Sequence, residues 1–306
     1  MVQAPRLTLA LDVGGTKIAA ALVDPDGTLV HTANRPTPNN GAEGVWAVVQ
    51  ELFTDALRVA GGVVGAVGIA SSGPINLATH TVSPINITCW RGFPLRDRVA
   101  AMAPGVPVRL AGDGLCMTLG EHWRGAGRDA RFLLGMVVST GVGGGLVLDG
   151  APYYGRTGNA GHVGHVVVDA DGQPCACGGR GCVETVAAGP SMVRWARANG
   201  WAAPPAAGGK ELAYAAAAGD AVAVRAFRRG AAALAAMIAS VAAVCDLDLV
   251  VIGGGIARSG PLLFEPLHTA LADYAHLDYL AGLRVVPAEL GGAAGLVGAA
   301  ALARLG

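Results

Sequence analysis

The same pattern of strand, glycine turn and strand occurs twice in this chain, and it constrains the fold more than any other feature. In the first copy, residues 8–27, an apolar run breaks at a glycine pair, resumes, and ends at a Pro-Asp-Gly turn. The second copy, residues 132–150, reads FLLGMVVSTGVGGGLVLDG. Apolar β-rich runs bounded by glycine turns predict strands. A unit used twice predicts two related lobes that face a cleft.

Helices are predicted between these and further strands. Residues 43–60 carry apolar side chains at helical spacing, and a pair of glycines stops that run. Further strands are predicted at 63–70, 106–110 and 247–252, and further helices at 115–123, 189–200, 221–245 and 293–305. Because strands and helices alternate, the predicted fold class is α/β.

Composition excludes several classes of protein. The formal net charge is zero, with 22 basic and 22 acidic residues and no basic stripe, which argues against a nucleic-acid surface. The N-terminus lacks the pattern of a secretory signal. The apolar run 231–245 is shorter than the roughly 18 to 20 residues that span a bilayer. We therefore expect a cytoplasmic protein in which this run forms a buried helix.

The first glycine turn, DVGGTK at residues 12–17, has the composition of a phosphate-binding loop. Gly14 and Gly15 allow backbone N–H groups to approach a phosphate, while Thr16 and Lys17 add a hydroxyl and a positive charge. Asp12 is a candidate ligand for Mg²⁺, directly or through water. The spacing is not that of a Walker loop. The alternative is an ordinary hairpin turn.

Two further glycine-rich turns could contact a nucleotide. STGVGGG, residues 139–145, resembles a dinucleotide fingerprint only weakly, because a strand rather than a helix follows it. Two such turns in one chain nevertheless favour phosphate binding over two unrelated hairpins. VIGGGIARSG, residues 251–260, leads from a buried strand through three glycines into a predicted helix. A tight strand-to-helix turn explains the last motif equally well.

Asp113 follows a short buried strand in the sequence LAGDG. In α/β sheets such a position projects into a cleft. A carboxylate there can accept the proton of a substrate hydroxyl during phosphoryl transfer. The alternative is a helix N-cap, where Asp is favoured, and both roles can hold at once.

A group of one histidine and three cysteines predicts a metal site. The spacing His165-x9-Cys175-x-Cys177-x4-Cys182 supplies the ligands of a closed tetrahedral Zn²⁺ site. Four protein ligands leave no open position, so the metal would be structural. Free buried cysteines do not explain three cysteines within eight residues.

In this order, the motifs resemble those of the ROK family of sugar kinases over nearly the whole chain. The most specific part is residues 161–184, similar to the family signature of GH followed by CxCGxxGCxE. The resemblance implies an actin-like (ribonuclease H-like) two-lobed fold with a zinc knuckle. It also implies binding of ATP and sugar between the lobes, phosphorylation of a hexose, and a homodimer or homotetramer.

The resemblance assigns roles to individual residues, with Asp113 as the catalytic base. The implied nucleotide-binding residues are Asp12, Gly14, Gly15, Thr16 and Lys17 in the first phosphate loop, Thr140, Gly141 and Gly143 in the second, and Gly254 and Gly255 on the adenosine side. The implied sugar-binding residues are Gly73, Asn86, Gly112, Asp113, His162, His165 and Glu184. The knuckle would thus aim sugar-binding side chains as well as bind zinc.

Two positions depart from the family pattern. Gly112 stands where the family usually has Asn, and His162 stands where it usually has the Glu of GExGH. Both positions contact the sugar in the family. Loss of such a side chain weakens hydroxyl recognition by roughly 1 to 3 kcal/mol. The identity of the sugar therefore stays open.

The expected function is that of an ATP-dependent hexose kinase, with glucose as the leading acceptor and N-acetylmannosamine or another hexose as the alternative. Polyphosphate is an alternative donor. A catalytically weak sugar-binding relative is also considered, and a DNA-binding repressor is not expected. The expected cofactors are ATP, Mg²⁺ and structural Zn²⁺, without nucleic-acid or membrane partners. The small lobe is expected to comprise residues 1–112 plus 293–306, and the large lobe residues 113–292.

Overall fold

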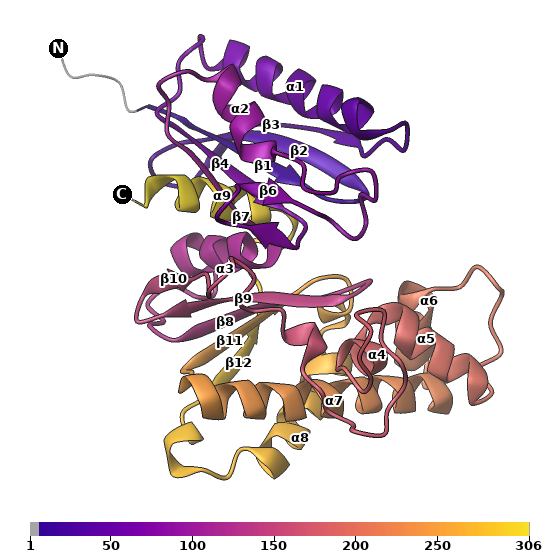
Figure 1. Cartoon of the computed structure of the whole chain (residues 1–306). Coiled ribbons are helices and arrows are strands. Elements are labelled where there is room, and N and C mark those ends of the chain that lie inside the picture. The colour runs from indigo at the N-terminus through magenta and orange to yellow at the C-terminus, as the bar shows by residue number, and fades with distance from the viewer. Residues whose placement is uncertain (1–5, 306) are drawn as a thin grey trace. The chain divides into compact units, whose positions relative to one another are not determined.

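The computed structural model describes residues 6–305, and the chain divides into two compact units (Figure 1). The first unit comprises Met1–Arg128, Pro152–Ala160 and Gly292–Gly306, and the second comprises Asp129–Ala151 and Gly161–Gly291. Residues 1–5 and 306 of the predicted small lobe lie outside the described residues. The contacts within the chain group residues 113–128 and 152–160 with the first unit. The lobe boundary at residue 112 stays a prediction.

The first unit is built on a five-stranded sheet of order β3-β2-β1-β4-β7. Its strands are β1 (Thr8–Val13), β2 (Lys17–Val23), β3 (Leu29–Pro36), β4 (Ala66–Ser71) and β7 (Val108–Gly112). β1 runs antiparallel to β2 and parallel to β4, which is parallel to β7. The carboxyl ends of β1, β4 and β7 therefore lie at one edge, where α/β folds place their ligands.

Helices α1 (Ala42–Val59), α3 (Asp113–Arg124) and α9 (Ala294–Arg304) pack against this sheet. α9 contacts both the sheet and α3, and it is rich in small residues because the backbones approach closely. A side chain at Gly298 would collide with the carbonyl group of Cys116 in α3. The short elements β5 (Ile75–Asn76), β6 (Thr81–Val82) and α2 (Leu95–Met102) complete the unit.

A second sheet, of order β10-β9-β8-β11-β12, repeats the arrangement. It belongs to the second unit except for Pro152 and Tyr153 of β10, which group with the first. Its strands are β8 (Leu133–Val138), β9 (Val142–Leu148), β10 (Ala151–Tyr153), β11 (Leu249–Gly253) and β12 (Arg284–Pro287). β8 is antiparallel to β9 and parallel to β11, as β1 is to β2 and β4. The prediction of one structural unit used twice is confirmed.

The helices of the second unit surround the long α7 (Ala221–Cys245), which packs against α4 (Glu184–Ala187), α5 (Gly189–Ala198), α6 (Gly209–Ala217) and α8 (Pro261–Tyr274). By length and composition alone α7 could cross a membrane, but 44% of its most apolar window is buried within the structure. The helix predicted after the glycines at 253–255 begins only at Pro261. The 3₁₀ turn η2 (Ala257–Ser259) and Gly260, whose φ is 58°, precede it.

Candidate functional site

The first glycine turn joins β1 to β2 and is held in place by hydrogen bonds on its inner side. The N–H of Gly14 donates to the carbonyl oxygen of Lys17 at 3.0 Å, and the hydroxyl of Thr37 donates to the carbonyl oxygen of Gly14 at 2.6 Å. The side chains of Thr16 and Lys17 are exposed. The turn therefore has fixed backbone geometry and presents a hydroxyl and an ammonium group to solvent.

Asn86, a predicted sugar-binding residue, lies against this turn. A Cβ atom at Gly15 would lie 2.6 Å from the Asn86 amide nitrogen, so only glycine fits. Gly73 lies in the loop that follows β4. The predicted phosphate loop and one predicted sugar contact thus come together within the first unit.

Asp113 lies directly after β7, at the carboxyl end of the sheet, as predicted from LAGDG. It is the first residue of α3, and Gly112 occupies the N-cap position that we considered for Asp113. Its two carboxylate oxygens accept hydrogen bonds from the Ser72 hydroxyl at 3.2 Å and from the Gly114 N–H at 2.8 Å. These bonds fix the orientation of the carboxylate.

Asp12 lies at the same edge of the sheet, near the end of β1. Burial, and after it the charge of Asp113, raise its pKa from 3.8 to about 6 against the opposing charge of Lys17. Gly295, in the first turn of α9, makes room for this carboxylate, because a Cβ there would lie 2.6 Å from an Asp12 oxygen. A partly buried carboxylate beside a second one favours a bound cation, so these residues fit Mg²⁺.

The neighbouring thiol of Cys116 responds to the same charges. It is fully buried, and burial, Asp12 and Asp113 together raise its pKa well above the ordinary value. It therefore stays a neutral thiol beside the two carboxylates.

Gly112 leaves open space where the family usually has Asn. A Cβ at this position would meet no described atom within 4 Å, and the backbone φ of −63° suits any residue. The glycine is therefore not required by local packing.

The second glycine turn joins β8 to β9 in the second unit. The N–H of Ser139 donates to the carbonyl oxygen of Gly141 at 2.9 Å. The N–H of Gly189 donates to the carbonyl oxygen of Ser139 at 2.8 Å. The N–H of Val142 donates to Glu184 at 2.8 Å. Sequence reasoning missed the contacts of Gly189 and Glu184 with this turn, because both join segments more than 40 residues apart. Gly143 follows in β9, where a Cβ would meet no described atom within 4 Å.

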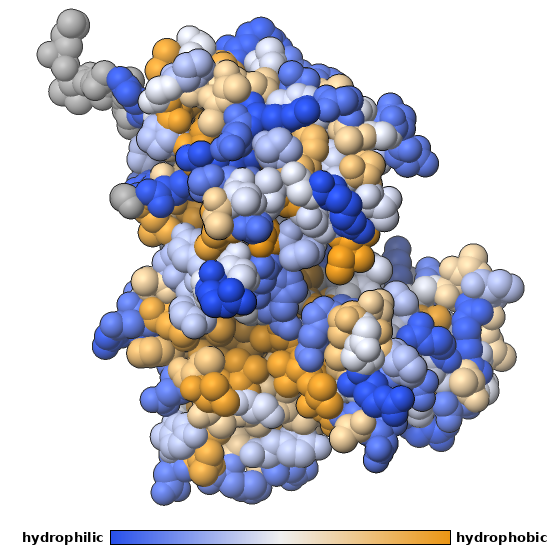
Figure 2. Space-filling model, in the orientation of Figure 1, coloured by the Kyte–Doolittle hydropathy of each residue, from blue (hydrophilic) through white to orange (hydrophobic). Residues whose placement is uncertain are grey.

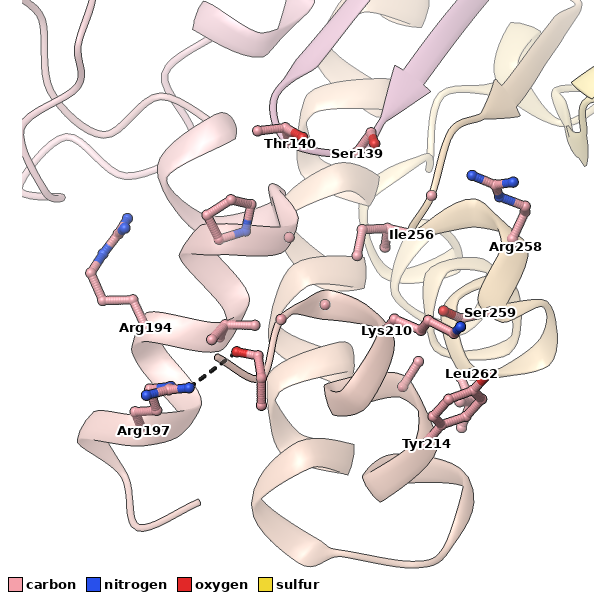
Figure 3. Close-up of a pocket in the computed structure, with 18 of the residues that line it drawn as sticks. Ser139, Thr140, Arg194, Arg197, Lys210, Tyr214, Ile256, Arg258, Ser259 and Leu262 are labelled. Atoms are coloured by element: carbon pink, nitrogen blue, oxygen red, sulfur yellow. Dashed lines mark hydrogen bonds between the residues drawn. The ribbon is translucent and has the colours of Figure 1, made fainter. Parts of the chain in front are cut away.

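A cavity of about 1100 Å³ lies beside this turn within the second unit (Figure 3). Of the predicted nucleotide-binding residues, Thr140 and Gly255 line it. Gly254, at φ 97°, packs so closely on Val138 that a side chain would collide with its carbonyl group. The other lining residues are Ser139, Gly189, Pro190, Val193, Arg194, Arg197, Pro205, Ala207, Gly208, Gly209, Lys210, Ala213, Tyr214, Ala217, Ile256, Arg258, Ser259 and Leu262.

Positive charge dominates the wall of this cavity. Arg194, Arg197, Lys210 and Arg258 line it, and no carboxylate does among the described lining residues (Figure 3). Arg197 donates to three backbone carbonyl groups and so holds the loop between α5 and α6. The other three cations suit an anionic ligand. No sequence motif marked α5 and α6, so this wall was not predicted.

The predicted metal ligands come together in the second unit. One ligand atom from each of His165, Cys175, Cys177 and Cys182 lies within 4.8 Å of the others. The Cys177 and Cys182 sulfur atoms are 3.7 Å apart, and Cys175 Sγ lies 3.8 Å from His165 Nδ1. Zinc–sulfur bonds of about 2.3 Å in a tetrahedron place sulfur atoms roughly 3.8 Å apart. The cluster therefore fits Zn²⁺.

The thiols of this cluster differ in acidity. Burial, and after it the hydrogen bonds with the neighbouring thiols, raise the pKa of Cys182 to about 12. The backbone N–H of Gly179 lowers the pKa of Cys177. A bound cation would hold all three as thiolates. His162, the residue that departs from the family pattern, stacks near His165 with ring centroids 6.5 Å apart.

Comparison with known proteins identifies the family. The sequence model of the ROK family matches residues 8–305. A glucokinase of Streptomyces coelicolor is 34% identical, over 97% of this chain and 98% of that protein. An N-acetylmannosamine kinase of Yersinia pseudotuberculosis is 36% identical, over 81% of this chain and 82% of that protein.

A solved structure agrees with the sequence matches. The ROK family glucokinase of Streptomyces griseus, in complex with glucose and AMPPNP, aligns with a TM-score of 0.83 and 36% identity, over 98% of this chain and all of that one. The predicted α/β class and actin-like two-lobed sugar kinase fold are confirmed. This chain belongs to the ROK family.

Proposed function

We propose that this protein is an ATP-dependent hexose kinase that transfers the γ-phosphoryl group to a sugar hydroxyl, with glucose to glucose 6-phosphate as the leading reaction. The arrangement at the carboxyl edge of the first sheet carries this proposal. It combines an oriented carboxylate at Asp113, a partly buried carboxylate of raised pKa at Asp12 and the glycine turn of residues 14–17. Relatives named glucokinase support it over nearly the full length of the chain.

Asp113 acts as the base. It accepts the proton of the sugar hydroxyl as that oxygen attacks the phosphorus atom, while Ser72 and the Gly114 N–H hold the carboxylate in position. The first glycine turn binds phosphate oxygens through its N–H groups, Thr16 and Lys17. Asp12 would hold Mg²⁺, which when bound neutralises charge on the donor phosphates.

The donor occupies the cavity of the second unit. Its apolar residues, including Ile256 and Leu262, suit a nucleoside, and its cations suit phosphates. Thr140 and Gly255 line this cavity, as expected for nucleotide contacts. ATP is the proposed donor, and polyphosphate, which lacks a base, is the alternative.

The acceptor depends on the two departures from the family pattern. Gly112 leaves space next to the proposed base, and His162 lies beside the proposed zinc ligand His165. Gly73, Asn86, His165 and Glu184 remain the other proposed sugar contacts. N-acetylmannosamine is the leading alternative acceptor, because a relative of that name is 36% identical. Weak catalysis with retained sugar binding is the second alternative.

The zinc ion has a structural role in this proposal. His165, Cys175, Cys177 and Cys182 fill all four positions of a tetrahedral site and leave none for substrate. The chemistry therefore stays with Asp113.

A cytoplasmic homodimer or homotetramer completes the proposal. Figure 2 shows a patch of hydrophobic residues on the viewed face of the second unit. On this unit Val244, Tyr274, Leu277 and Tyr279 are exposed, and the Tyr279 hydroxyl donates to the carbonyl oxygen of Ala243 at the end of α7. Exposed hydrophobic patches are typical of subunit interfaces.

An assay of ADP release with ATP and Mg²⁺ tests the proposal. Glucose, mannose, N-acetylmannosamine and N-acetylglucosamine are compared, with Asp113→Asn as the matched control. We expect turnover on glucose that the substitution removes. Turnover on another sugar alone would reassign the acceptor, and sugar binding without turnover on any of them would contradict the kinase assignment.

A further inference from the structure

The carboxylate of Glu184 connects the metal-binding segment to the second glycine turn. Glu184 begins α4, two residues after the proposed zinc ligand Cys182. Its Oε2 atom accepts the Val142 N–H at 2.8 Å. A Cβ at Gly141 would lie 2.6 Å from the same oxygen, so glycine at that position makes room for the carboxylate.

Segments on both sides of the cysteines hold this turn. After them, the N–H of Gly189 donates to the carbonyl oxygen of Ser139 at 2.8 Å. Before them, Gly164 packs so closely on the backbone carbonyl of Val142 that a side chain would collide with it. The two segments are joined to each other, because the N–H of Val183 donates to the carbonyl oxygen of Val166 at 2.9 Å.

These contacts leave the outer part of the turn available to a ligand. Glu184 occupies the Val142 N–H, whereas the N–H groups of Thr140 and Gly141 make no hydrogen bond within residues 6–305. Thr140 also lines the cationic cavity. Two N–H groups with a fixed orientation at such a place suit the oxygen atoms of a phosphate.

We propose that Glu184 is a positioning residue for the donor. The zinc-bound segment fixes the Glu184 carboxylate, and this carboxylate keeps the turn of residues 139–142 in the conformation that binds nucleotide phosphates. The inference rests on the proposed function, because that function supplies the nucleotide. It adds a donor-side role to the sugar contact that family resemblance implies for Glu184. Zinc loading then governs donor affinity as well as local shape.

The contact itself is tested in the zinc-loaded protein without ligands. Amide hydrogen exchange at Val142, read by NMR, is expected to quicken about fivefold or more in Glu184→Ala, because one hydrogen bond is lost. Glu184→Gln keeps a side-chain carbonyl acceptor and should exchange like the wild type. Gly282→Ala is the matched control, since a Cβ there meets no described atom within 4 Å.

The consequence for the donor is tested by calorimetry with AMPPNP and Mg²⁺, in the absence of sugar. Glu184→Ala is expected to weaken binding about fivefold or more, and Glu184→Gln should restore it to within about twofold of the wild type. Removal of zinc with a chelator should weaken binding in the wild type. Removal of zinc should weaken AMPPNP binding less in Glu184→Ala than in the wild type, because both changes release the same turn.

Unchanged exchange at Val142 in Glu184→Ala would overturn the proposal. So would unchanged AMPPNP affinity combined with weaker glucose binding, since Glu184 would then be a sugar ligand alone. A wild-type protein that binds no nucleotide would contradict the proposed function itself. The exchange measurement, which needs no ligand, would still decide whether Glu184 holds the turn.

Discussion

The two glycine turns are built alike, but the side chains around them carry opposite charge. Each joins the first two strands of a five-stranded sheet of the same order. The first is flanked by the carboxylates of Asp12 and Asp113, whereas the second lies at a cavity lined by Arg194, Lys210 and Arg258. The same hairpin thus occurs in both units, and the elements packed around it give the two turns surroundings of opposite charge.

On the acidic side, substitution of Asp113 should reduce activity most strongly. Asp113→Asn should lower kcat by about 10²- to 10⁴-fold, because the proposed general base is lost while the hydrogen bonds to its site can persist. Steady-state kinetics with glucose would measure the loss, and circular dichroism would show that the variant is folded. A variant with near wild-type kcat would show that Asp113 is not the base.

The metal-binding segment tests the second unit. Cys175→Ser, or chelation of the metal, should lower the free energy of unfolding by at least about 3 kcal/mol, since metal binding contributes directly to folding. Denaturant unfolding would measure this. Cys245→Ser, outside the cluster, serves as the matched control. Equal effects of both substitutions would mean that the four residues do not bind a stabilising metal.

The contribution of Asp12 to stability should depend on pH. Its pKa is raised from 3.8 to about 6, so the folded state binds more protons than the unfolded state between these values. The stability that it contributes is present below pH 3.8 and is lost as the pH rises through about 6. Asp12→Asn removes that loss. At pH 8 the metal-free variant should therefore be more stable than the metal-free wild type by on the order of 2 kcal/mol.

Denaturant unfolding without Mg²⁺, at pH 4 and pH 8, would measure this difference, with the exposed Asp26→Asn as control. The same variant should lose kinase activity. A variant that is destabilised equally at both pH values would argue against a raised pKa of Asp12 in the folded protein.

Substitution of Gly112 should change the affinity for the sugar only modestly. Gly112→Asn fills open space beside Asp113 with the side chain that the family usually carries, and it should strengthen glucose binding by about 1 kcal/mol. Calorimetry with glucose and with N-acetylmannosamine would show which sugar gains. Weaker binding of both would mean that the glycine is needed for the native acceptor.

Features set by local spacing were predicted from the sequence. The two hairpins, Asp113 at the end of a strand and the cluster of His165 with three cysteines all follow from residues close together in the chain. The bond between Glu184 and Val142 was not predictable, because it depends on how the metal-binding segment packs on β9. The cationic wall formed by α5, α6 and the segment after β11 was missed because it combines residues that are far apart in the chain.

The contact between Gly295 and Asp12 has a consequence for biosynthesis. The first unit takes α9 from a segment that the ribosome makes after the whole second unit. Until that segment emerges, the sheet lacks a helix that packs on β1 and β4, and Asp12 lacks the neighbour that helps to bury it. The nascent chain therefore completes its second unit first, and the surroundings of Asp12 are completed last.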